Sequence, residues 1–81
     1  MTREEAKNII SEEILRLAPE SDLTGVPDTC DLREALDLDS MDIFNLVIAL
    51  SKRLGVDIPD ADARRLVTLE GGADYLVDRC P

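Results

Sequence analysis

The segment SMDIFNLVIALSKRL, residues 40–54, most constrains the fold, because it carries apolar residues at helical spacing on two sides. With a rotation of about 100° per residue, the larger apolar side consists of Ile43, Leu46, Val47, Leu50 and Leu54. Met41, Phe44 and Ile48 gather on nearly the opposite side. A helix with two apolar sides is usually buried all round, but a chain of 81 residues has too small a core to enclose one. We therefore expect Met41, Phe44 and Ile48 to form an exposed docking surface, unless the preceding loop covers them.

Residues 2–17 have the pattern of an amphipathic helix with one apolar side. Thr2 and Glu5 have the spacing of a capping box at its start, and Pro19 ends it. The expected core-facing stripe consists of Ala6, Ile9, Ile10, Ile14 and Leu17. Most of the charged side chains lie on the other side, so we expect this helix to pack through a single face.

The last third of the chain predicts a short helix followed by a longer one. The stretch DIPDADARRL predicts the short helix, with Asp60 near its start. Residues 68–79 predict the longer helix, whose apolar stripe consists of Leu69, Ala73, Leu76 and Val77. Gly71 and Gly72 fall in its first turn, and glycine in a helix interior is less favourable than alanine by about 1 kcal/mol. We therefore expect this turn to be irregular.

Residues 18–38 form a long connection with two prolines, a glycine and several turn-forming side chains. The stretch LREAL within it predicts a short turn of helix. The apolar residues expected to hold the connection on the core are Leu23, Val26, Leu32, Leu36 and Leu38. We predict an all-α fold, a small bundle of three main helices plus one short helix, with a long loop between the first two main helices. We expect residues 1–81 to form a single domain.

Composition and charge exclude several functional classes. Eighteen acidic and nine basic side chains give a net charge of −9, which repels nucleic acid and anionic membranes. The chain has no histidine, which removes the usual histidine-based triads and zinc sites, and it has no calcium loop of the EF-hand spacing. No apolar run is long enough to span a bilayer, and no leader peptide is recognisable. We expect a cytoplasmic monomer that holds no metal and whose Cys30 and Cys80 are reduced thiols.

Ser40 stands at the expected start of the helix over residues 40–54, between Asp39 and Asp42. A serine at this position can accept hydrogen bonds from the first amides of a helix. It lacks the histidine base that a nucleophilic serine needs, so we expect no enzymatic activity. Another enzyme could instead modify Ser40, because a helix N-terminus favours an attached phosphate. These residues alone leave capping and modification open.

Further motifs surround this serine at characteristic spacings. The stretch DSMD at residues 39–42 is preceded by D-L-x-x-x-L at residues 31–36 and followed by LGVDIPD at residues 54–60, and then by Thr68 and Tyr75. In this combination, most of the chain from residue 31 onward resembles the acyl carrier protein family. The first helix and the long loop fit that family in size and place.

The resemblance implies that Ser40 carries 4′-phosphopantetheine, transferred from coenzyme A by a separate phosphopantetheinyl transferase that recognises Asp39 and uses magnesium. The thiol of this arm would hold acyl intermediates as thioesters and present them to enzymes of fatty-acid, polyketide or related acyl metabolism. These partners, acyl-transferring enzymes or synthases, are expected to have basic and apolar docking patches. The expected partner-binding residues are Asp37, Met41, Asp42, Phe44 and Ile48.

One departure from the family's pattern concerns the partners. Fatty-acid carriers usually have several glutamates along this helix, whereas this chain has Asn45 and then Ser51-Lys52-Arg53. The departure predicts a specialised carrier that serves a dedicated pathway, and the resemblance is to a stand-alone, bacterial-type member of the family. Two alternatives stay open. One is a stand-alone aminoacyl or peptidyl carrier with the same arm, and the other is an unmodified acidic helical interaction module in which Ser40 only caps its helix.

Overall fold

The computed structural model describes residues 1–80, in which three long helices and two short ones are the regular elements. They are α1 (Arg3–Leu17), α2 (Leu32–Ala35), α3 (Ser40–Leu54), η1 (Asp60–Leu66) and α4 (Leu69–Arg79). The all-α prediction is confirmed, and the LREAL stretch forms α2, a second short helix beside the expected η1, which is of the 3₁₀ type. Within residues 1–80, no helix is long and apolar enough to cross a membrane.

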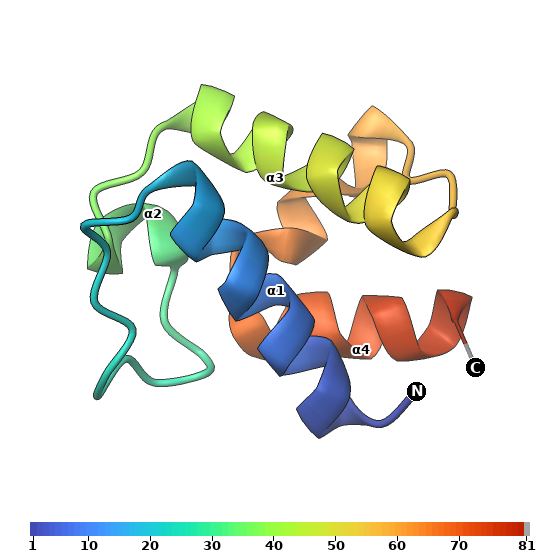
Figure 1. Ribbon diagram of the computed structural model, residues 1–81, viewed down its shortest axis with the longest axis horizontal. Helices are drawn as coiled ribbons and strands as arrows, with labels where there is room; N and C mark the ends of the chain where they lie inside the picture. Colours follow the sequence, from blue (N-terminus) through green and yellow to red (C-terminus); the bar gives the residue numbers. More distant parts are fainter. Residues whose placement is uncertain (81) are drawn as a thin grey trace.

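Helix α1 lies between α3 and α4 and joins them into one core (Figure 1). It packs against α4 and α3, while η1 packs against the same two helices. The core is aliphatic apart from Tyr75: it contains Ala6, Ile10, Ile14, Leu32, Leu46, Val47, Leu50, Ile58, Leu66, Leu69, Ala73, Tyr75 and Leu76. Leu17 was expected to face this core but is exposed. The reason is its position at the last residue of α1, where the chain turns away towards Pro19.

The helix ends follow the capping signals of the sequence. Thr2 and Glu5 form the expected capping box, in which the Glu5 amide donates to Thr2 Oγ1 at 3.1 Å and the Thr2 amide donates to Glu5 Oε1 at 3.3 Å. Gly55 ends α3 in the left-handed conformation, with φ at 66°, which glycine adopts without steric cost. Thr68 begins α4 by accepting from the Gly71 amide at 2.9 Å.

The first turn of α4 is regular, so the expected irregularity at Gly71 and Gly72 is wrong. Both glycines are required instead by close packing. A Cβ on Gly71 would lie 2.7 Å from the carbonyl oxygen of Arg65, and a Cβ on Gly72 would lie 2.9 Å from Cδ1 of Ile10. These distances are shorter than van der Waals contact, so the two glycines let α4 lie directly against the end of η1 and against α1.

The long loop between α1 and α2 is held by contacts with α1 and with α4. Asp28 pairs with Lys7 of α1, and its carbonyl oxygen accepts from the Glu70 amide at 3.0 Å. The Leu32 amide donates to the Val67 carbonyl oxygen at 2.7 Å. As expected, Leu32 is fully buried, and the other apolar loop residues pack partly buried against the core: Leu23, Val26, Leu36 and Leu38. These contacts hold the loop and α2 against α1, against Val67 and against the start of α4.

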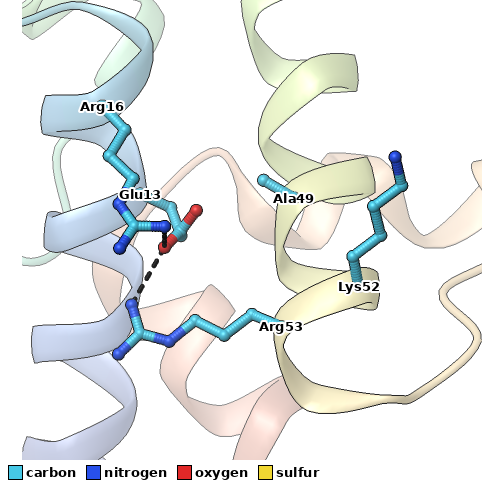
Figure 2. A pocket seen from close by; sticks show the side chains of 5 residues that line it. All are labelled: Glu13, Arg16, Ala49, Lys52 and Arg53. Atoms are coloured by element: carbon cyan, nitrogen blue, oxygen red, sulfur yellow. Dashed lines mark hydrogen bonds and ion pairs between the residues drawn. The ribbon is translucent and has the colours of Figure 1, made fainter.

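Glu13 is a buried charge that the sequence pattern did not reveal, since only 4% of it is exposed. Its carboxylate accepts from Arg53 of α3 at 2.9 Å and pairs with Arg16 at 3.4 Å (Figure 2). A shallow depression of about 550 Å³ lies here, lined by these three residues with Ala49 and Lys52. The Lys52 side chain points away from Glu13 (Figure 2). We infer that Glu13 and Arg53 fasten α1 to the C-terminal half of α3.

Candidate functional site

The cap of α3 is Asp39, one residue before Ser40. The Asp42 amide donates to Asp39 Oδ1 at 2.9 Å, and the Asp39 amide donates to Asp42 Oδ2 at 3.2 Å, so the two aspartates form a capping box. A capping residue needs extended backbone, which Asp39 has, whereas Ser40 is already helical. The alternative in which Ser40 only caps its helix is therefore wrong about the cap.

Ser40 is exposed at the first helical residue of α3. Because Asp39 makes the cap, the Ser40 hydroxyl is left accessible to another molecule. The chain has no histidine that could act as its base, and within residues 1–80 no group of three or more acidic or cysteine side chains is arranged to hold a metal ion. Ser40 therefore has the exposure of a modification site and lacks the neighbours of a catalytic nucleophile.

A cavity of about 210 Å³ lies beside Ser40. Four elements or connections contribute to its lining, which consists of Arg33 from α2, Ser40, Ile43 and Phe44 from α3, Ala63 and Arg64 from η1, and Val67. Because Ile43 is buried whereas Arg33 and Arg64 are exposed, we infer that Ile43 forms the floor of the cavity and that the two arginines lie at its edge. The depression near Glu13 is larger, but Ser40 does not line it. We therefore assign the site to the smaller cavity.

The two arginines at the edge of this cavity differ in their partners. Arg33 donates to Asp31 through Nε at 3.2 Å and through Nη2 at 2.8 Å. These hydrogen bonds raise the pKa of Arg33 and lower the pKa of Asp31. Among residues 1–80, none of the ion pairs involves Arg64. The guanidinium of Arg64 is therefore available to a ligand.

The apolar surface of α3 is exposed as expected. Met41 is 63% exposed, and Phe44 and Ile48 are each 39% exposed, so the loop does not cover them. Phe44 also lines the cavity beside Ser40, which makes the surface and the cavity continuous. Lys52 lies one helical turn beyond Ile48 on the same side of α3 and is exposed.

The two acidic residues expected to bind partners, Asp37 and Asp42, lie just before α3 and in its first turn, and both have structural roles as well. Asp42 is half-buried and holds the capping box. Asp37 is exposed and has a positive φ of 56°, a conformation that aspartate tolerates better than most residues. It turns the chain from α2 into α3.

Sequence reasoning missed Arg33, Ala63, Arg64 and Val67, because only tertiary packing brings them to Ser40. A hydrogen bond between two elements helps to place Ala63 and Arg64. In it, the Tyr75 hydroxyl of α4 donates to Asp62 Oδ2 of η1 at 2.7 Å. Burial and then this hydrogen bond raise the pKa of Tyr75. By joining η1 to α4, Tyr75 holds Ala63 and Arg64 at the cavity.

Comparisons with known proteins agree with this geometry. The family model described as "Phosphopantetheine attachment site" matches residues 6–76, which include Ser40 and every residue that lines the cavity. The acyl carrier protein of Rubrobacter xylanophilus is 35% identical over 74 residues, covering 83% of this chain and 91% of that protein. The acyl carrier protein of Campylobacter hominis is 32% identical over 73 residues, covering 90% of this chain and 86% of that protein.

A solved structure of the acyl carrier protein from Enterococcus faecalis has the same fold. Its TM-score to this chain is 0.72 with 26% sequence identity, and the match covers 98% of this chain and 99% of the other. The similarity thus extends over the whole arrangement of helices and includes the long loop as well as the neighbourhood of Ser40.

Proposed function

The chain belongs to the acyl carrier protein family, and on that premise we propose that Ser40 is the attachment point of its 4′-phosphopantetheine arm. As a member of this family, the protein is a carrier with a covalent phosphopantetheine cofactor. The arm supplies the thiol that holds acyl groups as thioesters. The observation that carries the proposal for Ser40 is that this residue is exposed at the start of α3. Asp39, and not Ser40, caps the helix, so the Ser40 hydroxyl is accessible.

The residues around Ser40 suit a phosphate-linked arm. The helix N-terminus has a positive partial charge, and Arg33 and Arg64 stand at the edge of the cavity that Ser40 lines. The apolar floor of this cavity, with Ile43 buried in it, suits the less polar part of an arm or its cargo. We assign to Asp39 a second role, in which its exposed carboxylate is recognised by the phosphopantetheinyl transferase.

The partner surface in this proposal is the exposed side of α3. Met41, Phe44 and Ile48 provide its apolar area, and Asp37 and Asp42 provide acidic contacts near Ser40. Exposed aromatic and aliphatic side chains of this kind are typical centres of protein interfaces. The partners are the transferase and acyl-transferring or synthase enzymes with apolar and basic docking patches.

Residues 1–81 act as a single carrier domain, which is monomeric and cytoplasmic and has no catalytic activity of its own. The exposed lysine at position 52, where fatty-acid carriers usually have acidic residues, favours a carrier for a dedicated pathway over one for housekeeping fatty-acid synthesis.

Attachment is tested by intact mass after incubation with coenzyme A, magnesium and a broad-specificity phosphopantetheinyl transferase. The protein should gain one phosphopantetheine, and Ser40→Ala should gain none. Ser51→Ala, on the same helix, is the matched control and should be modified like the original chain. If the mass stayed unchanged with several such transferases, the unmodified interaction module would become the better interpretation.

Docking is tested by placing a charge on the apolar surface. Phe44→Glu should slow modification by the transferase or turnover with an acyl-transferring enzyme, because it buries a carboxylate in the interface. Leu15→Glu is the matched control, since Leu15 is an apolar side chain of α1 that is 43% exposed. Equal rates for both variants, with unchanged circular dichroism, would contradict the proposed surface.

A further inference from the structure

The cavity beside Ser40 has an apolar floor and a cationic edge. Ile43 is buried at its floor, and Ala63 and Val67 are partly buried in its wall. Arg33 and Arg64, which come from two different elements, are exposed at its edge. A ligand that suits such a cavity has an apolar part and an anionic group next to it.

Both arginines have hydrogen-bond donors that are not used within residues 1–80. A guanidinium has five N–H donors in a planar fork that matches phosphate and carboxylate oxygens. Arg33 uses Nε and Nη2 on Asp31 and keeps Nη1, and Arg64 makes no ion pair within residues 1–80. The carboxylates of Asp39 and Asp42, at the start of α3, already accept hydrogen bonds from each other's backbone amides.

From these observations we infer that Arg64 and Arg33 form an anion-binding site at the edge of the cavity. The group that they bind is a phosphate or a carboxylate. It has two possible sources, the phosphodiester attached to Ser40 or a carboxylate on the cargo. The inference rests on the proposed attachment at Ser40, and it assigns to this chain two positioning residues that the sequence motifs do not include.

The site acts by holding the arm without any covalent step. When both arginines contact the anion, the arm lies along the cavity for a larger fraction of the time and is less mobile. At an exposed site, each arginine is expected to shift this binding equilibrium by about twofold to fivefold. Added salt should reduce the shift, since exposed charges are screened.

The test compares four states of the protein: unmodified, carrying the arm with a free thiol, loaded with butyryl, and loaded with succinyl. Intact mass confirms each state. The readouts are the Nε–Hε resonances of Arg64 and Arg33 and the ³¹P chemical shift of the arm. The variants are Arg64→Gln and Arg33→Gln, and Lys52→Gln is the matched control, because it removes one exposed positive charge away from the cavity.

Each source of the anion predicts its own pattern. If the phosphodiester is bound, the arginine resonances shift when the arm is attached and change little between cargoes. If a cargo carboxylate is bound, the resonances shift with succinyl and do not shift with butyryl. In both cases Arg64→Gln should weaken binding of the anion at the edge of the cavity, while Lys52→Gln should leave this binding unchanged. The inference would be overturned if the arginine resonances were the same in all four states. It would also be overturned if Arg64→Gln and Lys52→Gln had equal effects on binding of the anion.

Failure of the proposed attachment can be told apart from failure of the anion site. If intact mass shows no arm on Ser40, the unmodified protein is titrated with free 4′-phosphopantetheine while the Arg64 resonance is followed. A saturable shift that Arg64→Gln reduces supports the site even then. The absence of any shift would overturn it.

Discussion

Replacing Gly71 or Gly72 with alanine measures how closely α4 approaches η1 and α1. In a helix interior this change alone stabilises the fold by about 1 kcal/mol. Here the added Cβ would lie 2.7 Å from the Arg65 carbonyl oxygen at position 71 and 2.9 Å from Ile10 Cδ1 at position 72. Overpacking of a close-packed interior destabilises by about 1–3 kcal/mol, so the two effects oppose each other.

The atoms that meet the new methyl group determine the result. At Gly72 they are the ends of two side chains, with Leu66 Cδ2 at 3.1 Å as well as Ile10, and these can turn. The expected destabilisation is therefore about 0–2 kcal/mol. At Gly71 they are a backbone carbonyl and, at 2.9 Å, the Oγ1 of the capping Thr68. Disturbing a cap adds about 1 kcal/mol, so Gly71→Ala should destabilise by about 1–3 kcal/mol.

The free energy of unfolding is measured by urea titration and by thermal melts followed with circular dichroism. Each kcal/mol corresponds to about 4–8 °C in Tm for a domain of this size. Asn8→Ala, at an exposed position of α1, is the control and should stabilise by a few tenths of a kcal/mol from helix propensity alone. If both glycine variants were as stable as Asn8→Ala or more so, the close approach of α4 would be refuted.

Three further changes test single contacts. The pKa of Tyr75 in the folded protein is raised above 10.0, so the stability that this pKa shift contributes is complete below the unfolded pKa and is lost as pH rises through the folded pKa. Tyr75→Phe should therefore lose less stability at alkaline pH than the original chain, as measured by urea titrations across this pH range. Asp39→Asn should keep the melting temperature but slow phosphopantetheinylation, whereas Asp39→Ala should lower both the melting temperature and the rate, since asparagine caps a helix and alanine does not. If Asp39→Asn were modified as fast as the original chain, the transferase would not recognise the charge of Asp39. Arg53→Met should lower Tm more than Arg16→Met, because Arg53 is the closer and less exposed partner of Glu13.

The helices could be predicted from the sequence because their signals are local. Apolar spacing and capping residues gave the bounds of α1, α3 and α4 to within one or two residues. The start of α3 shows the limit of such signals. Ser40 alone was considered as the cap from the sequence, although aspartate is an equally good cap. The extended backbone of Asp39 and its hydrogen bond from the Asp42 amide identify Asp39 as the cap instead.

Other features depend on contacts between distant parts of the chain. Glu13 lies at the border of an apolar stripe and is buried because Arg53, 40 residues away, reaches it. Gly71 and Gly72 have an unfavourable helix propensity, and the reason for their presence is the nearness of Arg65 and Ile10. No periodicity within one helix contains this information, and the same holds for the arginines at the cavity.

The capping box also changes how a phosphate on Ser40 would be stabilised. A helix start leaves about four amides without partners inside the helix, and the capping box takes two of them, those of Asp39 and Asp42. The two carboxylates also offset part of the positive charge of the helix end. An anion attached to Ser40 therefore gains less from α3 than a bare helix N-terminus would give it. The positive charge that balances it has to come from another element, and Arg64 of η1 and Arg33 of α2 line the same cavity as Ser40. The stability of the helix and the affinity for the arm are thus assigned to different residues, so each can be altered without the other.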